Sequence, residues 1–315
     1  MKTEHLMSSM KNLDALFAAY PEKNKTEPGT LYLTATPIGN TMDITARALK
    51  ILSEVSFVAA EDTRNTGRLL AFYGIDKPLV SYFEHNKRQR GIMICDRLAK
   101  GESCALVTDA GMPAISDPGE DLVLLCQQRQ IPVRCVPGCC AVPTAVALSG
   151  LPTGRFVFEG FLPTAKGERR ERLQQIAAEY RTIVLYEAPH RLAGTLSDLC
   201  NVLGPDRQLA LCRELTKRNE QTVRTTLALA LQDCAQTPPR GEYVLVVQGA
   251  KAQPCAQPAF WSNMQIQEHV TYYLQQTPSL QKNEALKLVA KDRGMSKSAV
   301  YRMLLEEDRL AQQTK

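Results

Sequence analysis

Two aspartates lie in a loop of unusual composition, VTDAGMPAISDPG, from Val107 to Gly119. The apolar run before it, residues 104–107, predicts a buried strand, and the run at 122–126 predicts a helix. The stretch therefore follows the carboxyl end of a strand, which is where ligands bind in an open parallel sheet. Its glycines and prolines fix a backbone path whose N–H and C=O groups can approach a ligand closely. The alternative is an ordinary turn with Asp117 near the helix start, but such turns usually need only a few residues.

Two more loops built from proline and glycine are expected at the same edge, TPIGN at 36–40 and PGCC at 137–140. TPIGN is neither GxGxxG nor GxxxxGK[ST], so the sequence indicates neither a dinucleotide nor a nucleoside triphosphate. A nucleoside-sized ligand held mainly by backbone groups fits better, with Asp109 available to a hydroxyl or an ammonium group. No CxxC or Cys/His spacing surrounds Cys139 and Cys140, so no metal site is predicted.

Strands and helices alternate along the region that carries these loops, which predicts a parallel α/β sheet. One of its helices is expected from Ile44 to Leu52, with Asp43 as its cap. A second α/β region follows, in which several strands succeed one another without a long helix, so its sheet should be mixed. The expected strands are 31–36, 56–60, 79–82, 104–107 and 131–136 in the first region, and 155–158, 182–186, 208–212, 221–225 and 243–247 in the second.

The chain of 315 residues, 44% of them hydrophobic, is long enough for two or three domains. We expect a flexible extension at 1–29 with a short amphipathic helix at Leu13–Tyr20. The expected domains are α/β regions at 30–149 and 150–249, a linker at 250–262 and a helical domain at 263–315.

Composition excludes two classes of protein. No run of about 18 apolar residues occurs, and residues 1–29 lack the apolar core of a signal peptide, so a cytoplasmic protein is predicted, without membrane contact. Most of the ten cysteines lie in apolar runs, which favours free thiols over disulfides. The net charge of +5 permits nucleic-acid binding without requiring it.

The region from Lys282 to Arg302 resembles a helix-turn-helix, with a small residue where two helices cross, a glycine at the turn, a cap and a core valine. These are Ala290, Gly294, Ser296 and Val300. The region holds six Lys or Arg against two Asp or Glu, which suits a surface that faces phosphates. A small helical bundle without a ligand is the alternative.

Ordered blocks of sequence resemble one family. The blocks are TPIGN followed by DIT at 43–45, AEDTR at 60–64, SYFEHN at 81–86, VTDAGMPAISDPG at 107–119, VPG at 136–138, GLPTGRFVFEGFLP at 150–163, YEAPHR at 186–191, RELTK at 213–217 and RGEYVLVV at 240–247. In this order they resemble the tetrapyrrole methylase superfamily, and within it the bacterial methyltransferases that act on the ribose 2′-oxygen of a cytidine in 16S ribosomal RNA. The resemblance covers roughly Gly29 to the C-terminus.

The resemblance implies S-adenosylmethionine as cofactor, two α/β domains of tetrapyrrole methylase type with the donor between them, the 16S rRNA of the small ribosomal subunit as substrate, and a homodimer. The family usually has PGPSA where this chain has PGCCA, so the side chain of Cys140 offers no hydroxyl, although its backbone can still bind the donor. The donor-binding residues implied are Pro37, Gly39, Asp109, Gly111, Ile115, Ser116, Cys140, Ala141, Tyr186, Ala188, Leu215 and Gly241.

Methyl transfer to a hydroxyl needs an in-line approach, and a base that takes the hydroxyl proton could add roughly 10²–10⁴-fold to the rate. Asp62 and Glu187 are the candidate bases, and Asp109 and Glu214 are further carboxylates at strand ends. Each could instead cap a helix or pair with an arginine, and His85 and His190 are further candidates. The residues expected to contact RNA, largely through phosphates, are Arg64, His190, Arg191, Lys217, Lys297 and Arg302.

Two other functions are compatible with parts of the sequence. A small-molecule methylase of the tetrapyrrole type would fit the donor loops, but the basic C-terminal helices argue against it. A non-catalytic nucleic-acid-binding protein would fit those helices, but the retained donor loops argue against that.

Overall fold

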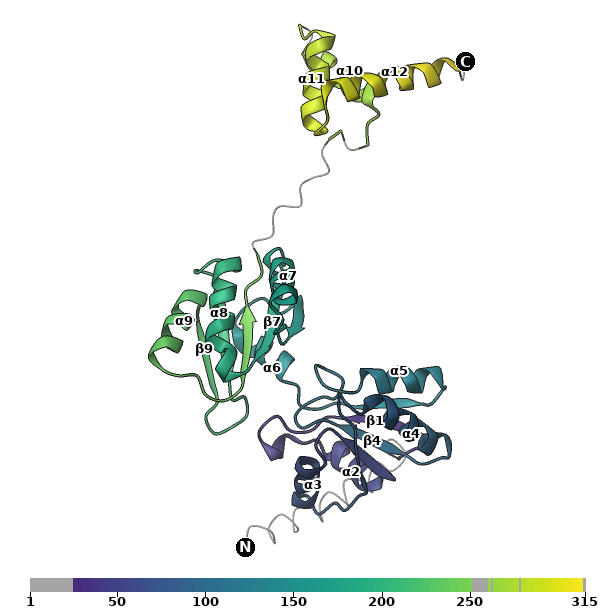
Figure 1. Cartoon of the computed structure of the whole chain (residues 1–315), viewed down its shortest axis with the longest axis vertical. Coiled ribbons are helices and arrows are strands. Elements are labelled where there is room, and N and C mark those ends of the chain that lie inside the picture. Colours follow the sequence, from purple (N-terminus) through teal and green to yellow (C-terminus); the bar gives the residue numbers. More distant parts are fainter. Residues whose placement is uncertain (1–24, 251–259, 262, 278, 314–315) are drawn as a thin grey trace. The chain divides into compact units, whose positions relative to one another are not determined.

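The computed structural model describes residues 25–250, 260–261, 263–277 and 279–313. Contacts divide the chain after Ala250 into two compact units. The first unit contains two five-stranded sheets and the second contains three helices (Figure 1). The predicted helix at Leu13–Tyr20 and most of the predicted linker at 250–262 lie outside the described residues.

The first sheet is parallel, with the strand order β3-β2-β4-β1-β5. Because all five strands run the same way, the loops that follow them gather at one edge. The strands are β1 (Leu31–Thr34), β2 (Phe57–Ala60), β3 (Leu79–Ser81), β4 (Cys104–Val107) and β5 (Val133–Val136). The helices are α2 (Ala46–Glu54), α3 (Thr63–Phe72), α4 (Lys87–Ala99) and α5 (Glu120–Gln128).

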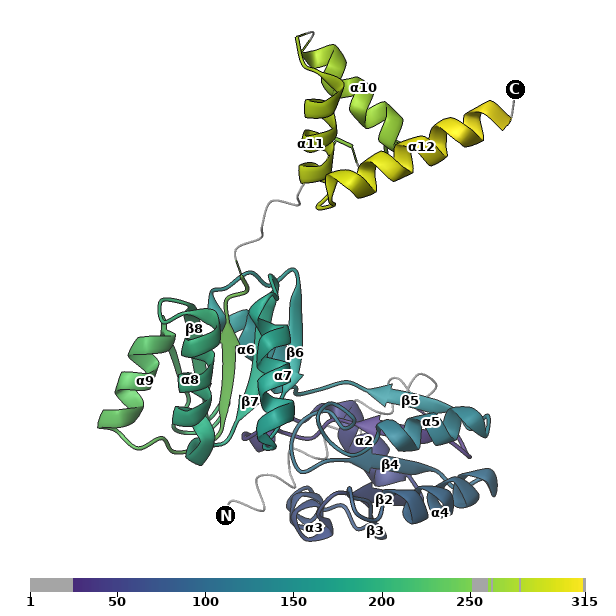
Figure 2. The ribbon, with the colours of Figure 1, turned by 45° about the horizontal axis from the view of Figure 1, so that its top comes forward.

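The inner strands β2 and β4 are buried on both faces and are apolar throughout, whereas the edge strand β5 exposes Arg134 and Cys135. In β4, Ala105 and Val107 pack toward α2 and α3, whereas Cys104 and Leu106 pack toward α4 and α5 (Figure 2). This alternation follows from the two-residue period of a strand. The two helical layers hold the sheet rigidly beneath the loops at its edge.

The predicted cap of α2 was wrong. Thr45 caps this helix, and its side-chain oxygen accepts a hydrogen bond of 3.1 Å from the backbone N–H of Ala48. Asp43 instead ends a short 3₁₀ helix, η2 (Thr41–Asp43), which Asn40 caps. Ile44 is extended, with ψ of 138°, so the α-helix cannot begin before it.

The second sheet is mixed, as predicted, with the order β6-β7-β10-β8-β9 and only β6 parallel to its neighbour. Helices α7, α8 and α9 cover one face, and α6 packs on the other (Figure 2). The strands are β6 (Phe156–Gly160), β7 (Thr182–Glu187), β8 (Gln208–Arg213), β9 (Gln221–Thr226) and β10 (Tyr243–Val247). The helices are α6 (Ala141–Ser149), α7 (Lys166–Ala177), α8 (Pro189–Leu203) and α9 (Leu227–Gln236).

The second unit has its own core, and its described residues form α10 (Ile266–Gln276), α11 (Lys282–Asp292) and α12 (Lys297–Gln313). Ala290 and Val300 are buried, as the predicted helix-turn-helix requires. The Ser296 hydroxyl accepts a hydrogen bond of 3.3 Å from the N–H of Ala299, which caps α12. The predicted fold class, two α/β regions with parallel and mixed sheets and a helical C-terminal part, is confirmed.

Candidate functional site

A cavity of about 520 Å³ is lined by loops of the first sheet and by residues of the second. Its volume lies within the range of about 300–1,000 Å³ that is typical of small-molecule sites. Eight of the residues predicted to bind the donor line it: Gly111, Ile115, Ser116, Cys140, Ala141, Tyr186, Ala188 and Leu215.

Strained backbone is concentrated at this cavity. Among the described residues other than glycine, five have positive φ, and four of these lie in the loops after β4 and β8. Such conformations cost about 1–3 kcal/mol each and persist only where the surrounding structure imposes them. The four are Ala114 (66°), Ser116 (67°), Glu214 (52°) and Thr216 (65°). Both loops are therefore held in fixed shapes beside the cavity.

Gly111 joins two of the loops. Its N–H donates to the carbonyl of Thr36 (3.1 Å) and its carbonyl accepts from the N–H of Thr36 (2.9 Å). Its φ of 86° is a conformation that residues with a side chain rarely adopt, and an added Cβ would lie 3.3 Å from Cγ2 of Ile38. Since Gly111 and Ile38 both line the cavity, the bridge fixes its floor.

Two glycines allow the first α/β region to approach the second closely. A Cβ on Gly39 would overlap Cγ of Lys217 and lie 3.0 Å from the carbonyl oxygen of Leu215. A Cβ on Gly160, at the end of β6, would lie 2.9 Å from the hydroxyl of Ser116. Loops after β1 and β4 are thus packed directly against the second region.

Four residues predicted to bind the donor do not line the cavity. Pro37 and Asp109 line a separate cavity of about 310 Å³, where a carboxylate oxygen of Asp109 accepts from the side-chain amide of Asn65 (3.0 Å). Gly39 packs on the loop at 215–217. Gly241 packs against the side chain of Glu214, and a Cβ added to Gly241 would lie 2.5 Å from Cγ of Glu214. Their immediate neighbours Ile38, Ala110 and Glu242 line the cavity instead.

Asp62, one of the two candidate bases, caps α3. Its carboxylate accepts from the backbone N–H of Arg64 (2.8 Å) and pairs with the Arg64 guanidinium (2.9 Å). The Arg64 guanidinium, with its backbone N–H, holds the pKa of Asp62 at about 2. Asp62 is not among the residues that line the 520 Å³ cavity, and the side chain of Arg64 is 83% exposed.

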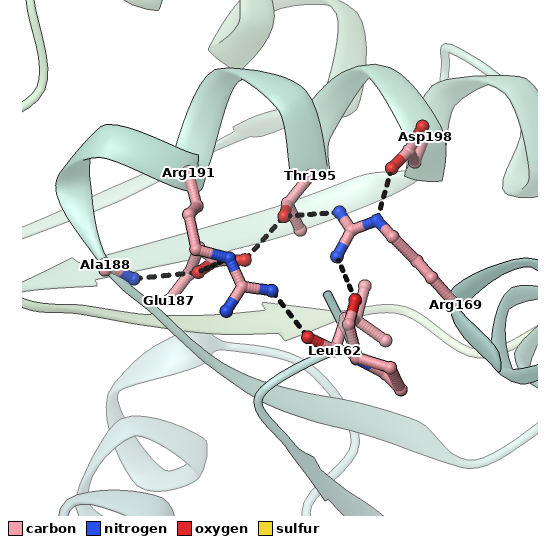
Figure 3. Close-up of polar contacts among 8 residues, drawn as sticks. Leu162, Arg169, Glu187, Ala188, Arg191, Thr195 and Asp198 are labelled. Carbon is pink, nitrogen blue, oxygen red and sulfur yellow. Dashed lines mark hydrogen bonds and ion pairs between the residues drawn. The ribbon is translucent and has the colours of Figure 1, made fainter. Parts of the chain in front are cut away.

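Glu187, the other candidate base, lies at the cavity, but its carboxylate is fully buried and engaged. One oxygen accepts from the N–H of Ala188 (2.9 Å) and lies 3.4 Å from Nε of Arg191. The other accepts from the hydroxyl of Thr195 (2.5 Å), as Figure 3 shows. Its role as a base stays a prediction, and the contacts indicate a structural task.

The residues predicted to bind RNA lie on several elements of both units. His190 is exposed and lines the cavity, whereas Arg191 donates to the carbonyl of Leu162 (2.5 Å). The ammonium of Lys217 lies between carboxylates of Glu214 (3.0 Å) and Glu242 (2.8 Å). In the second unit, Lys297 and Arg302 are both exposed on α12, and Lys297 donates to the side chain of Asn283 (3.3 Å).

Asp117 lies at the site although the sequence pattern did not predict it there. Helix α5 begins at Glu120 behind Gly119, which leaves Asp117 in the loop and at the cavity. Burial, and after it the negative charge of Glu61, raise the pKa of Asp117 to about 6. Asp117 lies in a long loop, three residues before the helix begins, and this position could have indicated that it belongs to the site.

An aromatic wall was also missed. Phe161 and Tyr186 line the cavity with ring centroids 5.6 Å apart, and Phe158 lies 5.0 Å from Tyr186. Phe161 follows the bend at Gly160, where the pairing of β6 with β7 shifts register. Nothing local in the sequence shows that this bend turns the ring toward Tyr186.

Two kinds of feature are absent from the part of the chain that the structure describes. No group of three or more His, Cys, Asp or Glu residues there is arranged to hold a metal ion. None of the helices described is both long enough and apolar enough to cross a membrane.

Comparisons with known proteins agree on one family. A family model described as Tetrapyrrole (Corrin/Porphyrin) Methylases matches residues 30–230. The chain is 42% identical over 285 residues to Ribosomal RNA small subunit methyltransferase I of Halalkalibacterium halodurans, covering 90% of this chain and 98% of the relative. It is 44% identical over 278 residues to the protein of the same name from Synechocystis sp., covering 88% and 98%. Among solved structures it is similar to uroporphyrin-III C-methyltransferase from Thermus thermophilus complexed with S-adenyl homocysteine, with a TM-score of 0.51, 19% identity, and coverage of 70% of this chain and 97% of that chain.

Proposed function

Because the chain belongs to the tetrapyrrole methylase family, we propose that it is an S-adenosylmethionine-dependent methyltransferase that modifies the ribose 2′-oxygen of a cytidine in small-subunit ribosomal RNA. One observation carries the proposal. Identity of 42–44% to relatives named Ribosomal RNA small subunit methyltransferase I extends over nearly their whole length. It therefore includes the loops that line the cavity, which lie between residues 38 and 244.

The cavity has the character that the donor needs. Its apolar part is made by side chains such as Ile115, Phe161 and Tyr186, and its charged part includes the carboxyl group of Asp117. A partly desolvated carboxylate attracts a cation more strongly than one in bulk water does. When bound there, S-adenosylmethionine supplies a methyl group on a positively charged sulfur.

The protein's own contribution to the reaction is mainly positioning. The bridge between Thr36 and Gly111 and the strained loops at Ser116 and Thr216 fix the shape of the cavity before any ligand enters. A preformed site of this kind can hold two reactants in line, which can supply a large part of a rate enhancement. The aromatic wall of Phe161 and Tyr186 borders the same space.

The segment from Lys282 to Arg302, with six Lys or Arg against two Asp or Glu, supports RNA as the acceptor. Lys297 and Arg302 are exposed on α12 of a unit that has its own core, so they are available to phosphates. A small tetrapyrrole would have no use for such a surface. Self-association of the chain stays a prediction.

The proposed function is tested by incubating the protein with labelled S-adenosylmethionine and either small ribosomal subunits or porphyrin precursors. We expect label in the RNA, and nuclease digestion should release it as 2′-O-methylcytidine. Label in the porphyrin precursor would support the small-molecule alternative. Binding of RNA without any transfer of label would support a non-catalytic binding protein.

We expect donor affinity to depend on pH through Asp117. Below pH 6 its carboxyl is largely protonated and neutral, because its pKa is raised to about 6, and above that pH it is negative. Affinity for the cationic donor should therefore rise by about two- to fivefold between pH 5 and pH 7.5, the range typical of a partly solvated charge pair.

Calorimetric titration with S-adenosylmethionine over this pH range checks the expectation. Asp117→Asn should flatten the profile, whereas Asp206→Asn, which changes an exposed aspartate outside the cavity, should leave it unchanged. A profile that keeps its rise in Asp117→Asn would show that another group titrates.

A further inference from the structure

Two guanidinium groups, two carboxylates and one hydroxyl form a connected polar network beside the cavity (Figure 3). Arg169 of α7 donates to Asp198 (2.7 Å) and to the hydroxyl of Thr195 (2.8 Å), both on α8. The hydroxyl of Thr195 donates to Glu187 (2.5 Å), and Glu187 also pairs with Arg191 (3.4 Å). The network thus extends from α7 through α8 to the end of β7.

The charges of the network balance, since two carboxylates face two guanidinium groups. Within the network the carboxylate of Glu187 is fully buried, and a buried charge is tolerated only when it is paired and hydrogen-bonded. The hydroxyl of Thr195 links the two halves, because it donates toward Glu187 and accepts from Arg169. Thr195 is 1% exposed, so water cannot easily take its place.

The network holds two segments that line the cavity. Arg191 and Arg169 donate to the backbone carbonyls of Leu162 (2.5 Å) and Pro163 (3.3 Å), which fixes the loop after β6. Glu187 accepts from the N–H of Ala188 (2.9 Å), which fixes the turn from β7 into α8. The first segment carries Phe161, and the second carries the lining residues at 186–190.

We propose that Thr195 is a positioning residue for donor binding. Its hydroxyl fixes the position of the Phe161 loop relative to the turn at 186–190. The rings of Phe161 and Tyr186 are thereby held at the spacing that closes one side of the cavity. Arg169 and Arg191 serve this network through their guanidinium groups, not an RNA phosphate. The inference rests on the proposed function in one respect, which is that the cavity binds the donor.

Two substitutions at Thr195 separate positioning from stability. Thr195→Val keeps the shape of the side chain but removes the hydroxyl, which leaves Arg169 and Glu187 each without one partner. It should weaken binding of S-adenosylhomocysteine about tenfold, because an unsatisfied buried polar group displaces the elements that it held. Thr195→Ser keeps the hydroxyl and loses only a buried methyl group, so it should lower the melting temperature while changing the affinity by less than about twofold.

Titration calorimetry and thermal melts on the full chain measure both quantities. Arg172→Gln is the matched control on α7, because Arg172 is half exposed and pairs with Glu159 at 3.4 Å, outside the network. It should leave the affinity at the wild-type value. If Thr195→Val does not fold, Arg169→Lys should weaken binding instead, since one ammonium cannot reach Asp198, Thr195 and the Pro163 carbonyl together.

The inference would be overturned, and the proposed function left intact, if a folded Thr195→Val protein bound with wild-type affinity. If the valine variant does not fold, wild-type affinity in Arg169→Lys would have the same consequence. Equal losses of affinity in the valine and serine variants would also overturn it, because the hydroxyl would then not be the cause. Failure of the wild-type protein to bind S-adenosylhomocysteine would count against the proposed function itself.

Discussion

Gly111→Val is expected to lower affinity for S-adenosylmethionine at least about 100-fold, which corresponds to about 2.8 kcal/mol. Gly111 has φ of 86°, which a β-branched residue adopts only with strain. Its Cβ would also lie 3.3 Å from the Ile38 side chain and 3.6 Å from the Cys139 carbonyl oxygen. The substitution therefore pushes apart three loops that meet at the cavity.

Calorimetry and circular dichroism on the purified variant measure the two consequences. Gly74→Val is the matched control, because Gly74 has a similar φ of 71° but nothing lies within 4 Å of its added Cβ. It should cost similar stability and leave donor affinity unchanged. Unchanged affinity in a folded Gly111→Val protein would remove this loop from the donor site.

Deleting residues 260–315 is expected to reduce affinity for small-subunit RNA strongly while leaving donor affinity nearly unchanged. The deleted helices have their own core, and the donor cavity is lined only by residues up to Val244. Exposed basic residues contribute to RNA affinity by releasing counterions from phosphates, so the loss should be largest at low salt. Filter binding with the RNA and calorimetry with the donor measure the two affinities separately.

The double variant Lys297→Ala/Arg302→Ala tests the same surface without a deletion. A plot of log affinity against log salt has a negative slope. For each phosphate that the variant no longer neutralises, this slope should become shallower by about 0.7–0.9. The pair Lys77→Ala/Lys100→Ala removes the same charge from the first α/β region and should leave the slope unchanged. A lowered melting temperature with an unaltered slope in the first variant would assign α12 to packing or self-association.

The sequence was sufficient to locate the cavity because the loops after parallel strands must meet at one edge. Gly111, Ser116 and Cys140 could be placed there from strand order and turn composition alone. The close packing of Gly39 on Lys217 could not be predicted, since it joins loops that are far apart in the chain. Local sequence patterns predict where each strand ends and therefore where its loop begins. The contact between Gly39 and Lys217 depends instead on how the two sheets pack together.

Charged residues show the same limit. Arg191 and Lys217 have the composition and position of phosphate-binding residues, yet Arg191 pairs with its near neighbour Glu187, and Lys217 pairs with Glu214 and with Glu242, which only the fold brings near. Asp117 looked like a helix-start residue, and its raised pKa arises from burial and from Glu61 on a different strand end. A basic or acidic side chain at a strand end is therefore a weak guide to its partner.

The close approach at Gly39 limits how this protein can evolve. The absence of a side chain there is required by the neighbouring loop, because an added Cβ would press on Lys217 and on the carbonyl oxygen of Leu215. A lysine side chain can be exchanged for a smaller one, but no substitution removes a backbone carbonyl. At Gly160, the one atom close to an added Cβ is the hydroxyl oxygen of Ser116. If Ser116 first became alanine, asparagine could replace Gly160, because asparagine tolerates the φ of 64° at this position. One glycine is thus fixed by its surroundings, and the other can change together with its neighbour.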